Sequence, residues 1–340
     1  MKSYRQTTLG LEGLQLVEEA EPGMPTGRQV LVRIRASSLN FRDLLLLKTG
    51  VPAQYLVGTG RFPACDGAGE VLAVGSDVTR VRPGERVAAT FHWDWIAGPI
   101  PPTLNTYGRG TKGNDGMLTE MTLVDESELV HLPEHLSFEE GATLPCAGVT
   151  AWYALRGDLP LLPGEDVLVQ GTGGVSVFAL QYAKLAGARV IATTTSPGKM
   201  DALSKMGADV VIDASGGAGW HEQVLAATAG RGVDLTVEVG GSASWQDTVK
   251  ATREHGRISL VGAVGGRDKG VGWDFTGRGL HLHPTRVGSR LHFEQMNRAI
   301  AFHALRPVID RIFDFEDARA AFEYFEHGSR IGKVVIRHGD

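Results

Sequence analysis

The chain has 340 residues, more than one hydrophobic core usually holds, so we expect two domains. A net charge of -5, with 42% hydrophobic and 21% charged residues, is typical of a globular protein and offers no basic stripe for nucleic acid. No apolar run reaches the length of a membrane span, and the start of the chain lacks the apolar core of a signal peptide. The two cysteines, Cys65 and Cys146, are far apart in the sequence, which favours reduced thiols and a cytoplasmic location.

The first 145 residues predict a β-rich domain. Short runs such as 30–35 and 69–74 have the residue types of strands and lie between glycines and prolines. Residues 91–116 are rich in proline and glycine and predict a long loop. The aromatic and polar residues His92 to Trp95 either line a substrate pocket or pack beneath this loop.

From about residue 165 to 265 strands and helices alternate, which predicts an α/β domain with a parallel, doubly wound sheet. Ligands bind such sheets at the carboxyl ends of the strands, where Gly171, Thr194, Gly240 and Gly262 fall. The expected strands are 167–169, 189–196, 210–212, 235–239 and 258–261. One expected helix begins near residue 174, a second ends near residue 206, and two more span 220–229 and 244–253.

A glycine turn between the first strand and helix of this region predicts a dinucleotide site. Gly171 permits the tight turn, Gly173 lets the backbone approach a pyrophosphate, and the helix from Gly174 directs its free N–H groups toward phosphates. Ser176 stands where the pattern expects a third glycine, and serine is small enough to preserve contact between helix and strand.

The second strand of the region ends in hydroxyl groups, where an NAD site usually carries an acid. Thr193 to Ser196 are followed by Lys199. Hydroxyls and a cation suit the 2′-phosphate of NADPH, which a carboxylate would repel. We therefore predict NADPH rather than NADH; the alternative is that Lys199 is a solvated residue at the start of the next helix.

After this region, helices are expected at 295–305 and 316–325, and a strand at 333–337 that returns to the first domain. His281 and His283 are interpreted as residues of a strand rather than as metal ligands. No internal repeat is evident.

Several motifs occur in order along the whole chain. They are Asn40-Phe41-Arg42-Asp43, Pro63-Ala64-Cys65-Asp66-Gly67-Ala68-Gly69-Glu70-Val71, Ala142-Thr143-Leu144-Pro145-Cys146-Ala147-Gly148-Val149-Thr150-Ala151-Trp152 and Gly332-Lys333-Val334-Val335. Together with the glycine turn, they resemble the medium-chain dehydrogenase/reductase superfamily, in its zinc-independent quinone-oxidoreductase-like branch. The resemblance implies a GroES-like catalytic domain at 1–145 and 289–340, a Rossmann domain at 146–288, and an active site where the two meet.

The resemblance also implies which residues bind the cofactor. The pyrophosphate would lie against the glycine turn and the adenosine ribose against the end of the second strand, while other residues would line the nicotinamide half. The implied cofactor-binding residues are Thr150, Gly171, Thr172, Gly173, Gly174, Val175, Thr194, Ser196, Lys199, Gly240, Val261, Ala263 and Val264.

Zinc-using members of the superfamily carry ligands at positions that correspond here to Asn40, Cys65 and Cys146. An amide is a poor zinc ligand, and between Phe91 and Gly116 nothing corresponds to the four cysteines of the family's second metal site. We therefore expect no metal, and we interpret both cysteines as small, buried, inert residues.

Without zinc, hydrogen-bond donors must stabilise the oxygen on which negative charge develops. Asn40 carries an amide donor and is the predicted orienting group, with a purely structural role as the alternative. Tyr55 is the predicted active-site phenol, with proton transfer from water as the alternative. Asp43 is expected to hold its loop rather than to titrate.

We therefore predict an NADPH-dependent oxidoreductase that transfers hydride to a quinone or an α,β-unsaturated carbonyl compound without zinc. The alternatives are an alcohol dehydrogenase or ketone reductase acting on C–OH or C=O, and an NADPH-binding sensor protein of low turnover. The expected partners are a small-molecule substrate and, by resemblance, a second copy of the chain that pairs through an edge strand near 280–286, with a tetramer as the alternative. Neither nucleic acid nor a membrane is expected as a partner.

Overall fold

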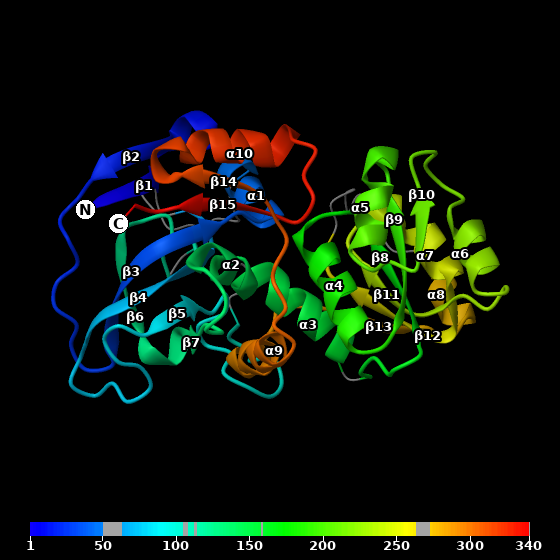
Figure 1. Ribbon diagram of the computed structural model, residues 1–340, viewed down its shortest axis with the longest axis horizontal. Coiled ribbons are helices and arrows are strands. Elements are labelled where there is room, and N and C mark those ends of the chain that lie inside the picture. The colour runs from blue at the N-terminus through cyan, green and yellow to red at the C-terminus, as the bar shows by residue number, and fades with distance from the viewer. Residues whose placement is uncertain (50–62, 105–107, 112–113, 158, 263–272, 340) are drawn as a thin grey trace. The chain divides into compact units, whose positions relative to one another are not determined.

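The computed structural model describes residues 1–49, 63–104, 108–111, 114–157, 159–262 and 273–339 (Figure 1). It divides into a first unit, Met1–Val149 with Val287–Asp340, and a second unit, Thr150–Arg286. One unit is β-rich and the other is built on a parallel sheet, which confirms the predicted α/β fold class. Among the described residues, no helix combines the length and apolar character needed to cross a lipid bilayer.

The first unit is formed mainly by strands. They are β1 (Lys2–Gln6), β2 (Leu14–Glu18), β3 (Gln29–Ser38), β4 (Asp66–Val74), β5 (Arg86–Ala89), β6 (Met121–Asp125), β7 (Leu129–His131), β14 (Ile309–Asp314) and β15 (Lys333–Arg337). Its helices are α1 (Phe41–Thr49), α2 (Phe138–Ala142), α9 (Arg290–Phe302) and α10 (Ala318–His327).

Among the described residues, β1 and β2 form a two-stranded sheet, and the other strands of this unit form a seven-stranded sheet in the order β14-β15-β3-β4-β5-β7, with β6 also paired with β3. β15 runs antiparallel to β3, with Val335 opposite Ser38. The last strand of the chain therefore completes the sheet begun by the N-terminal segment, and both ends of the chain lie in this unit (Figure 1).

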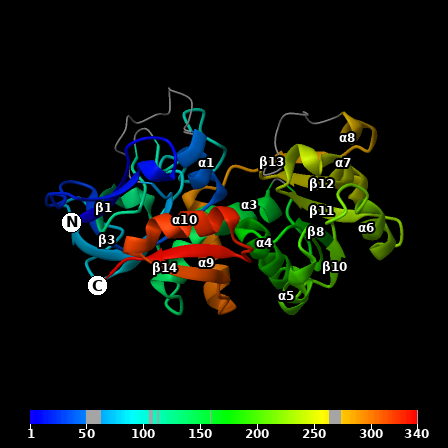
Figure 2. The same ribbon diagram turned by 90° about the horizontal axis from the view of Figure 1, so that it is seen from above.

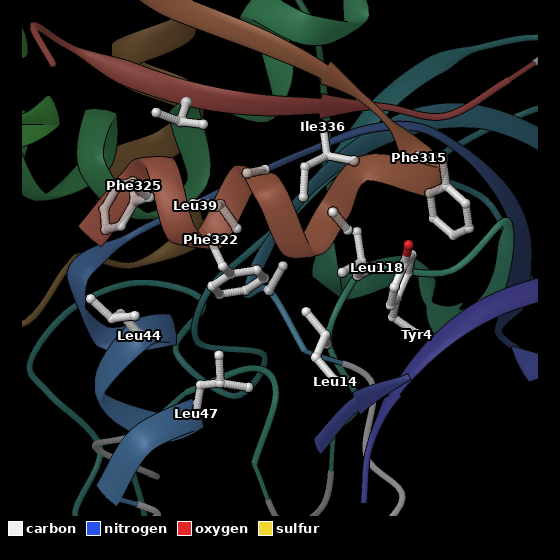
Figure 3. Close-up of a cluster of buried hydrophobic side chains, with 14 residues drawn as sticks. Tyr4, Leu14, Leu39, Leu44, Leu47, Leu118, Phe315, Phe322, Phe325 and Ile336 are labelled. Carbon is white, nitrogen blue, oxygen red and sulfur yellow. The ribbon is translucent and has the colours of Figure 1, made fainter. Parts of the chain in front are cut away.

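A buried apolar cluster anchors the elements that flank this sheet (Figure 3). Phe322 and Phe325 of α10 pack with Leu44 and Leu47 of α1, and Ile336 of β15 belongs to the same cluster. Burying side chains of this size contributes roughly 1.5–3 kcal/mol each. The cluster therefore holds α1 and β15, whose first residues lie beside the candidate site, in fixed positions.

His338, just beyond β15, makes the first unit sensitive to acid. It is 4% exposed, and burial lowers the pKa of its imidazole to about 3. In the unfolded chain the imidazole takes up a proton near pH 6.5, so stability falls as pH drops from about 6.5 toward 3, by about 1.4 kcal/mol per pH unit. We expect the urea midpoint of His338→Gln to fall less than that of the wild type between pH 7 and pH 5.

The matched control for this prediction is His303→Gln, because His303 is an exposed residue at the C-terminal cap of α9. Its urea midpoint should keep the wild-type dependence on pH. If His338→Gln showed the same acid sensitivity as the wild type, another group would have to be its source.

The second unit is a doubly wound α/β domain. Its strands are β8 (Asp166–Gln170), β9 (Arg189–Thr194), β10 (Val210–Asp213), β11 (Val233–Glu238), β12 (Thr252–Leu260) and β13 (His281–Pro284). Its helices are α3 (Val149–Arg156), which begins at the last residue of the first unit, α4 (Gly174–Leu185), α5 (Met200–Lys205), α6 (His221–Ala227), α7 (Trp245–Ala251) and α8 (Asp274–Gly277).

The strands of this unit pair in the order β10-β9-β8-β11-β12-β13, and every pairing is parallel. Figure 1 shows α4 and α5 on one side of the strands and α6 and α7 on the other; Figure 2 gives the same sheet from above. All residues of β8 are buried, as expected for a strand covered on both faces. β13 is an edge strand, and a dimer formed through it stays a prediction.

Element boundaries differ from the expected ones where local side-chain bonds decide them. The helix expected from residue 295 begins at Arg290, because Ser289 and His292 form a capping box in which each side chain bonds the backbone N–H of the other. The strand expected from 258 already begins at Thr252. Helix α1 was not expected from the sequence.

Candidate active site

The glycine turn of the second unit leaves open space in front of its backbone. Gly171 has a φ of 75°, and a Cβ added at Gly171 or Gly173 would meet no heavy atom within 4 Å. Gly173 is the N-cap of α4 and makes no side-chain cap bond, so the first N–H groups of the helix face this space. A pyrophosphate fits such an arrangement of open backbone and helix N-terminus.

Ser176 has a structural reason to replace the third glycine of the pattern. It is buried in α4, and its hydroxyl donates to the backbone oxygen of Gln170 at 2.6 Å. Gln170 is the last residue of β8, so this bond joins the helix to the strand directly beside the turn. The serine therefore maintains helix–strand contact through a hydrogen bond.

The residues predicted to surround the adenosine ribose lie at the end of β9. The Thr194 hydroxyl accepts a bond from the Ser196 N–H at 3.1 Å and stabilises the turn after the strand. The Lys199 ammonium donates to the Thr172 hydroxyl at 3.3 Å. The lysine therefore reaches the glycine turn, which brings the two predicted parts of the cofactor site together.

The predicted nicotinamide half is formed in part at the carboxyl ends of β11 and β12. Gly240 follows β11, and the Val261 N–H after β12 donates to the Glu238 backbone oxygen at 2.9 Å, which places both at the same edge of the sheet. Thr150 is buried in the first turn of α3. Ala263 and Val264 lie outside the described residues.

Sequence reasoning missed a buried polar network that links the two halves of this site. The Glu238 carboxylate is 1% exposed and accepts bonds from the Gly240 and Gly241 N–H groups at 2.6 and 2.8 Å. It also accepts the Gln170 side-chain amide at 2.9 Å, directly before the glycine turn. The sequence could have indicated this network, because Gln170 and Glu238 are polar residues at the ends of buried strands.

A second polar site lies wholly within the first unit. We call it the thiol–carboxylate cluster; it comprises Asn40, Cys65, Asp66, Cys146 and Lys333. The ligand atoms of Cys65, Asp66 and Cys146 all lie within 4.8 Å of one another. Asn40 and Lys333 bond to Asp66 and to each other, so residues from distant parts of the chain share one buried site.

Both polar atoms of the Asn40 side chain are bound to protein groups. Its amide nitrogen donates to the Asp66 carboxylate at 2.8 Å and lies 3.4 Å from the Cys65 sulfur. Its amide oxygen accepts from the Lys333 ammonium at 2.6 Å. The amide is therefore a connector between the cation and the carboxylate in the described structure.

Asp43 holds the loop, as the sequence led us to expect. Its carboxylate accepts the backbone N–H of Asn40 at 2.9 Å and that of Cys65 at 3.2 Å. Trp95, predicted either to line a pocket or to pack, is 1% exposed and bonds the Gly98 backbone oxygen at 3.0 Å, so it packs beneath its loop. Tyr55 lies outside the described residues.

Burial controls the protonation of the thiol–carboxylate cluster. It raises the pKa of the Cys65 thiol well above its usual value, and the neighbouring Cys146, Asp43 and Asp66 raise that pKa further. Burial also raises the pKa of Asp66, although the Lys333 ammonium and the Asn40 amide oppose this rise. The cluster therefore favours a neutral thiol beside a carboxylate that is compensated by a lysine.

Cys65, Asp66 and Cys146 could together hold a metal ion, but the Asn40 amide beside them does not suit zinc. Zinc binds thiolates, and it takes three or four good ligands. Here the oxygen of Asn40, the only atom of that amide able to bind a metal, is already bound to Lys333. The Asp66 carboxylate accepts hydrogen bonds from the Asn40 amide and the Ser38 hydroxyl. It also lies 3.5 Å from the Lys333 ammonium, and this positive charge would repel a divalent cation.

Comparisons with known proteins identify the family of the chain. Residues 26–134 match the alcohol dehydrogenase GroES-like domain, and residues 174–302 match the zinc-binding dehydrogenase family. A zinc-type alcohol dehydrogenase-like protein of Schizosaccharomyces pombe is 34% identical over 335 residues, covering 96% of both chains. The chain belongs to this family of medium-chain dehydrogenases/reductases.

Two further similarities concern activity. A quinone oxidoreductase of Pseudomonas aeruginosa is 37% identical over 206 residues, which cover 60% of this chain and 54% of that protein. The crystal structure of an NAD-dependent alcohol dehydrogenase superposes over the whole of both chains with a TM-score of 0.87 and 29% identity. This family member is therefore an oxidoreductase that uses a nicotinamide cofactor.

Proposed function

We propose that this dehydrogenase/reductase uses NADPH to reduce a quinone or an α,β-unsaturated carbonyl compound, and that it does so without zinc. The observation that carries the cofactor assignment is the end of β9, where Thr194 and Ser196 take the place of an acid and Lys199 reaches the glycine turn. A 2′-phosphate gains from a cation and from hydroxyl donors at this position. When bound, the reduced nicotinamide ring supplies a hydride.

The class of substrate follows from the thiol–carboxylate cluster. A metal would act as a Lewis acid on a carbonyl oxygen, and the Asn40 amide and Lys333 ammonium of the cluster do not suit zinc. A conjugated acceptor spreads the developing charge over several atoms, so it needs less stabilisation at a single oxygen than an isolated carbonyl does. Quinones and enones are conjugated acceptors of this kind.

Within this proposal, Asn40 is a positioning residue and Tyr55 remains the predicted phenol. The Asn40 amide holds the Asp66 carboxylate and the Lys333 ammonium at 2.8 and 2.6 Å, which keeps the cluster in one arrangement. Its proposed role is therefore to orient the groups around the substrate.

The cofactor assignment predicts a selective effect of Lys199→Ala. Loss of a cation near the 2′-phosphate should raise the Kd for NADPH about tenfold, or about 1.4 kcal/mol, and leave the Kd for NADH nearly unchanged. Fluorescence titration of both cofactors measures this. Lys205→Ala, an exposed lysine at the end of α5, is the matched control and should change neither constant. Equal losses for NADPH and NADH in Lys199→Ala would contradict the assignment.

The metal assignment predicts that purified protein holds far less than one zinc per chain. Elemental analysis measures this content, and treatment with a chelator should leave the rate of NADPH oxidation unchanged. Stoichiometric zinc together with loss of activity on chelation would overturn the zinc-free proposal.

A second candidate function is alcohol or ketone oxidoreduction, favoured by the relatives that are named alcohol dehydrogenases. A panel of quinones, enones, aldehydes and alcohols, each assayed with both cofactors, separates the candidates. Preferential oxidation of alcohols would favour the dehydrogenase. Tight NADPH binding without turnover on the whole panel would favour a sensor protein.

A further inference from the structure

The two cysteines of the chain are neighbours in space. Cys65 and Cys146 are separated by eighty residues of sequence, yet both sulfurs belong to the thiol–carboxylate cluster and lie within 4.8 Å of each other. Neither forms a disulfide in the structure; Cys65 is buried and Cys146 is partly exposed. A disulfide needs the sulfurs at about 2.05 Å and the Cβ atoms at about 3.5–4.5 Å, so the two sulfurs must move closer together before they can bond.

The backbone on both sides of this pair departs from regular structure. Ala64, directly before Cys65, has a φ of 62°, in the left-handed region that alanine rarely adopts. Cys146 lies in the π-helical turn Leu144–Gly148 that precedes α3. Such turns and strained residues are frequent at functional sites, and they let a chain take a second local arrangement more easily than a regular helix or strand.

The surroundings of the sulfurs are polar. The Arg42 guanidinium interacts with the Cys65 thiol, and Cys65 also contacts the carboxylates of Asp43 and Asp66 at 3.7 and 3.5 Å. Structural cysteines that are inert lie in apolar surroundings, whereas reactive ones lie near cations and are partly exposed. The buried position expected from the sequence therefore holds for Cys65 and is wrong for Cys146, which is partly exposed as reactive cysteines are.

We propose that Cys65 and Cys146 are a site of oxidative modification, at which a peroxide converts the two thiols into a reversible intramolecular disulfide. The Cys146 sulfur attacks one peroxide oxygen, the O–O bond breaks, and the departing oxygen leaves as water with the thiol proton. The Cys65 sulfur then attacks the sulfenic sulfur of Cys146, the S–S bond forms, and the S–O oxygen leaves as a second water. The two thiols lose two electrons and two protons, and the peroxide is reduced to two waters.

Formation of this bond alters the thiol–carboxylate cluster. The Cys65 sulfur must move toward Cys146, and this movement changes its contacts with the Asn40 amide, now 3.4 Å away, and with the Asp66 carboxylate at 3.5 Å. A shift of about 1 Å in groups that orient a substrate can reduce activity about a hundredfold. The disulfide therefore switches the candidate active site off, a consequence that rests on the proposed function, whereas the bond itself does not.

The test is treatment of the purified full-length protein with hydrogen peroxide, followed by peptide mapping without reduction. The expected result is a cross-linked peptide that contains both cysteines and has lost two hydrogens, with free thiols falling from two per chain to none. Dithiothreitol should restore both thiols and the reductase activity. Methionine oxidation adds oxygen instead, so mass separates the two modifications.

Two variants check the order of events and the assignment. In Cys65→Ser the sulfenic acid should persist on Cys146, where dimedone traps it, and in Cys146→Ser the buried Cys65 should stay reduced. Thermal unfolding of the reduced variants establishes that they are folded; if either is not, the wild-type peptide map decides alone. A disulfide between two chains, or oxidation of Cys146 to sulfinic acid with Cys65 still free, would overturn the proposal. A disulfide that forms without loss of activity would keep the modification site and overturn the switch.

Discussion

Replacing Gly173 by valine is expected to raise the Kd for the nicotinamide cofactor about a hundredfold, or about 2.8 kcal/mol, while the protein stays folded. Gly173 has a φ of -72°, which any residue adopts, and an added Cβ would meet no protein atom within 4 Å. The valine side chain would fill the space in front of the turn. It would keep a pyrophosphate from the helix N–H groups, each charge-assisted bond being worth roughly 1.5–3 kcal/mol.

Calorimetric titration measures the affinity, and urea unfolding measures the free energy of unfolding, which should fall by about 1 kcal/mol because valine is a poor N-cap. Gly277→Val is the matched control, since Gly277 is exposed at the end of α8 and an added Cβ there also meets no atom within 4 Å. Its Kd should equal that of the wild type. Wild-type affinity in Gly173→Val would mean that the cofactor does not approach this turn.

Replacing Lys333 by methionine is expected to destabilise the protein by about 3–5 kcal/mol. The Lys333 side chain is 2% exposed, and its ammonium donates to the Leu39 backbone oxygen at 2.8 Å and to Asn40, beside the fully buried carboxylate of Asp66. Methionine fills much of the same volume but leaves these acceptors and the buried charge without their cation. Urea unfolding at pH 8 measures the loss.

The loss in Lys333→Met should shrink in acid. Burial already raises the pKa of Asp66, so its carboxyl group holds a proton more tightly in the folded protein than in the unfolded chain. The contribution of Asp66 to stability therefore falls as pH rises from its pKa in the unfolded chain to its higher pKa in the folded protein. Removal of Lys333 raises the pKa further, because the ammonium is the main group that lowers it. The free energy of unfolding of Lys333→Met should therefore be closer to that of the wild type at pH 5 than at pH 8.

Lys184→Met is the control for this prediction. Lys184 pairs with Asp209 at 2.7 Å, but both side chains are about one-third exposed, so this ion pair is worth at most about 1 kcal/mol. A loss in Lys333→Met no larger than in Lys184→Met would show that the buried cation does not compensate Asp66.

Local patterns were sufficient to predict most of the second unit, although α3 and α8 were not expected. The apolar run at 167–169, the glycine turn and the helix from Gly174 lie where β8 and α4 are found, because strand and helix periodicity and turn chemistry are properties of neighbouring residues. The first and last residues of helices and strands were harder to predict, in both units. α9 begins at Arg290 because of a capping box between Ser289 and His292, a pattern in which histidine replaces the usual Glu or Gln.

The candidate site of the first unit could be predicted only in part. Family motifs identified Asn40, Cys65 and Cys146 as corresponding positions, but they did not reveal that Asp66 and Lys333 complete the cluster. Lys333 comes from the last strand, and it reaches Asn40 because β15 pairs with β3. Pairing between strands so distant in sequence depends on the whole sheet and cannot be read from local periodicity.

The sequence by itself determined the class of protein, through motifs spread along the chain. It also determined the parallel sheet and the position of the glycine turn, because these depend on residues that are near one another in the sequence. Only the tertiary structure decided that Lys199 reaches Thr172, that Ser176 bonds Gln170, and that the two cysteines share a site with a buried lysine. These contacts join segments up to about three hundred residues apart, and their energies depend on burial and distance, which exist only once the chain has folded.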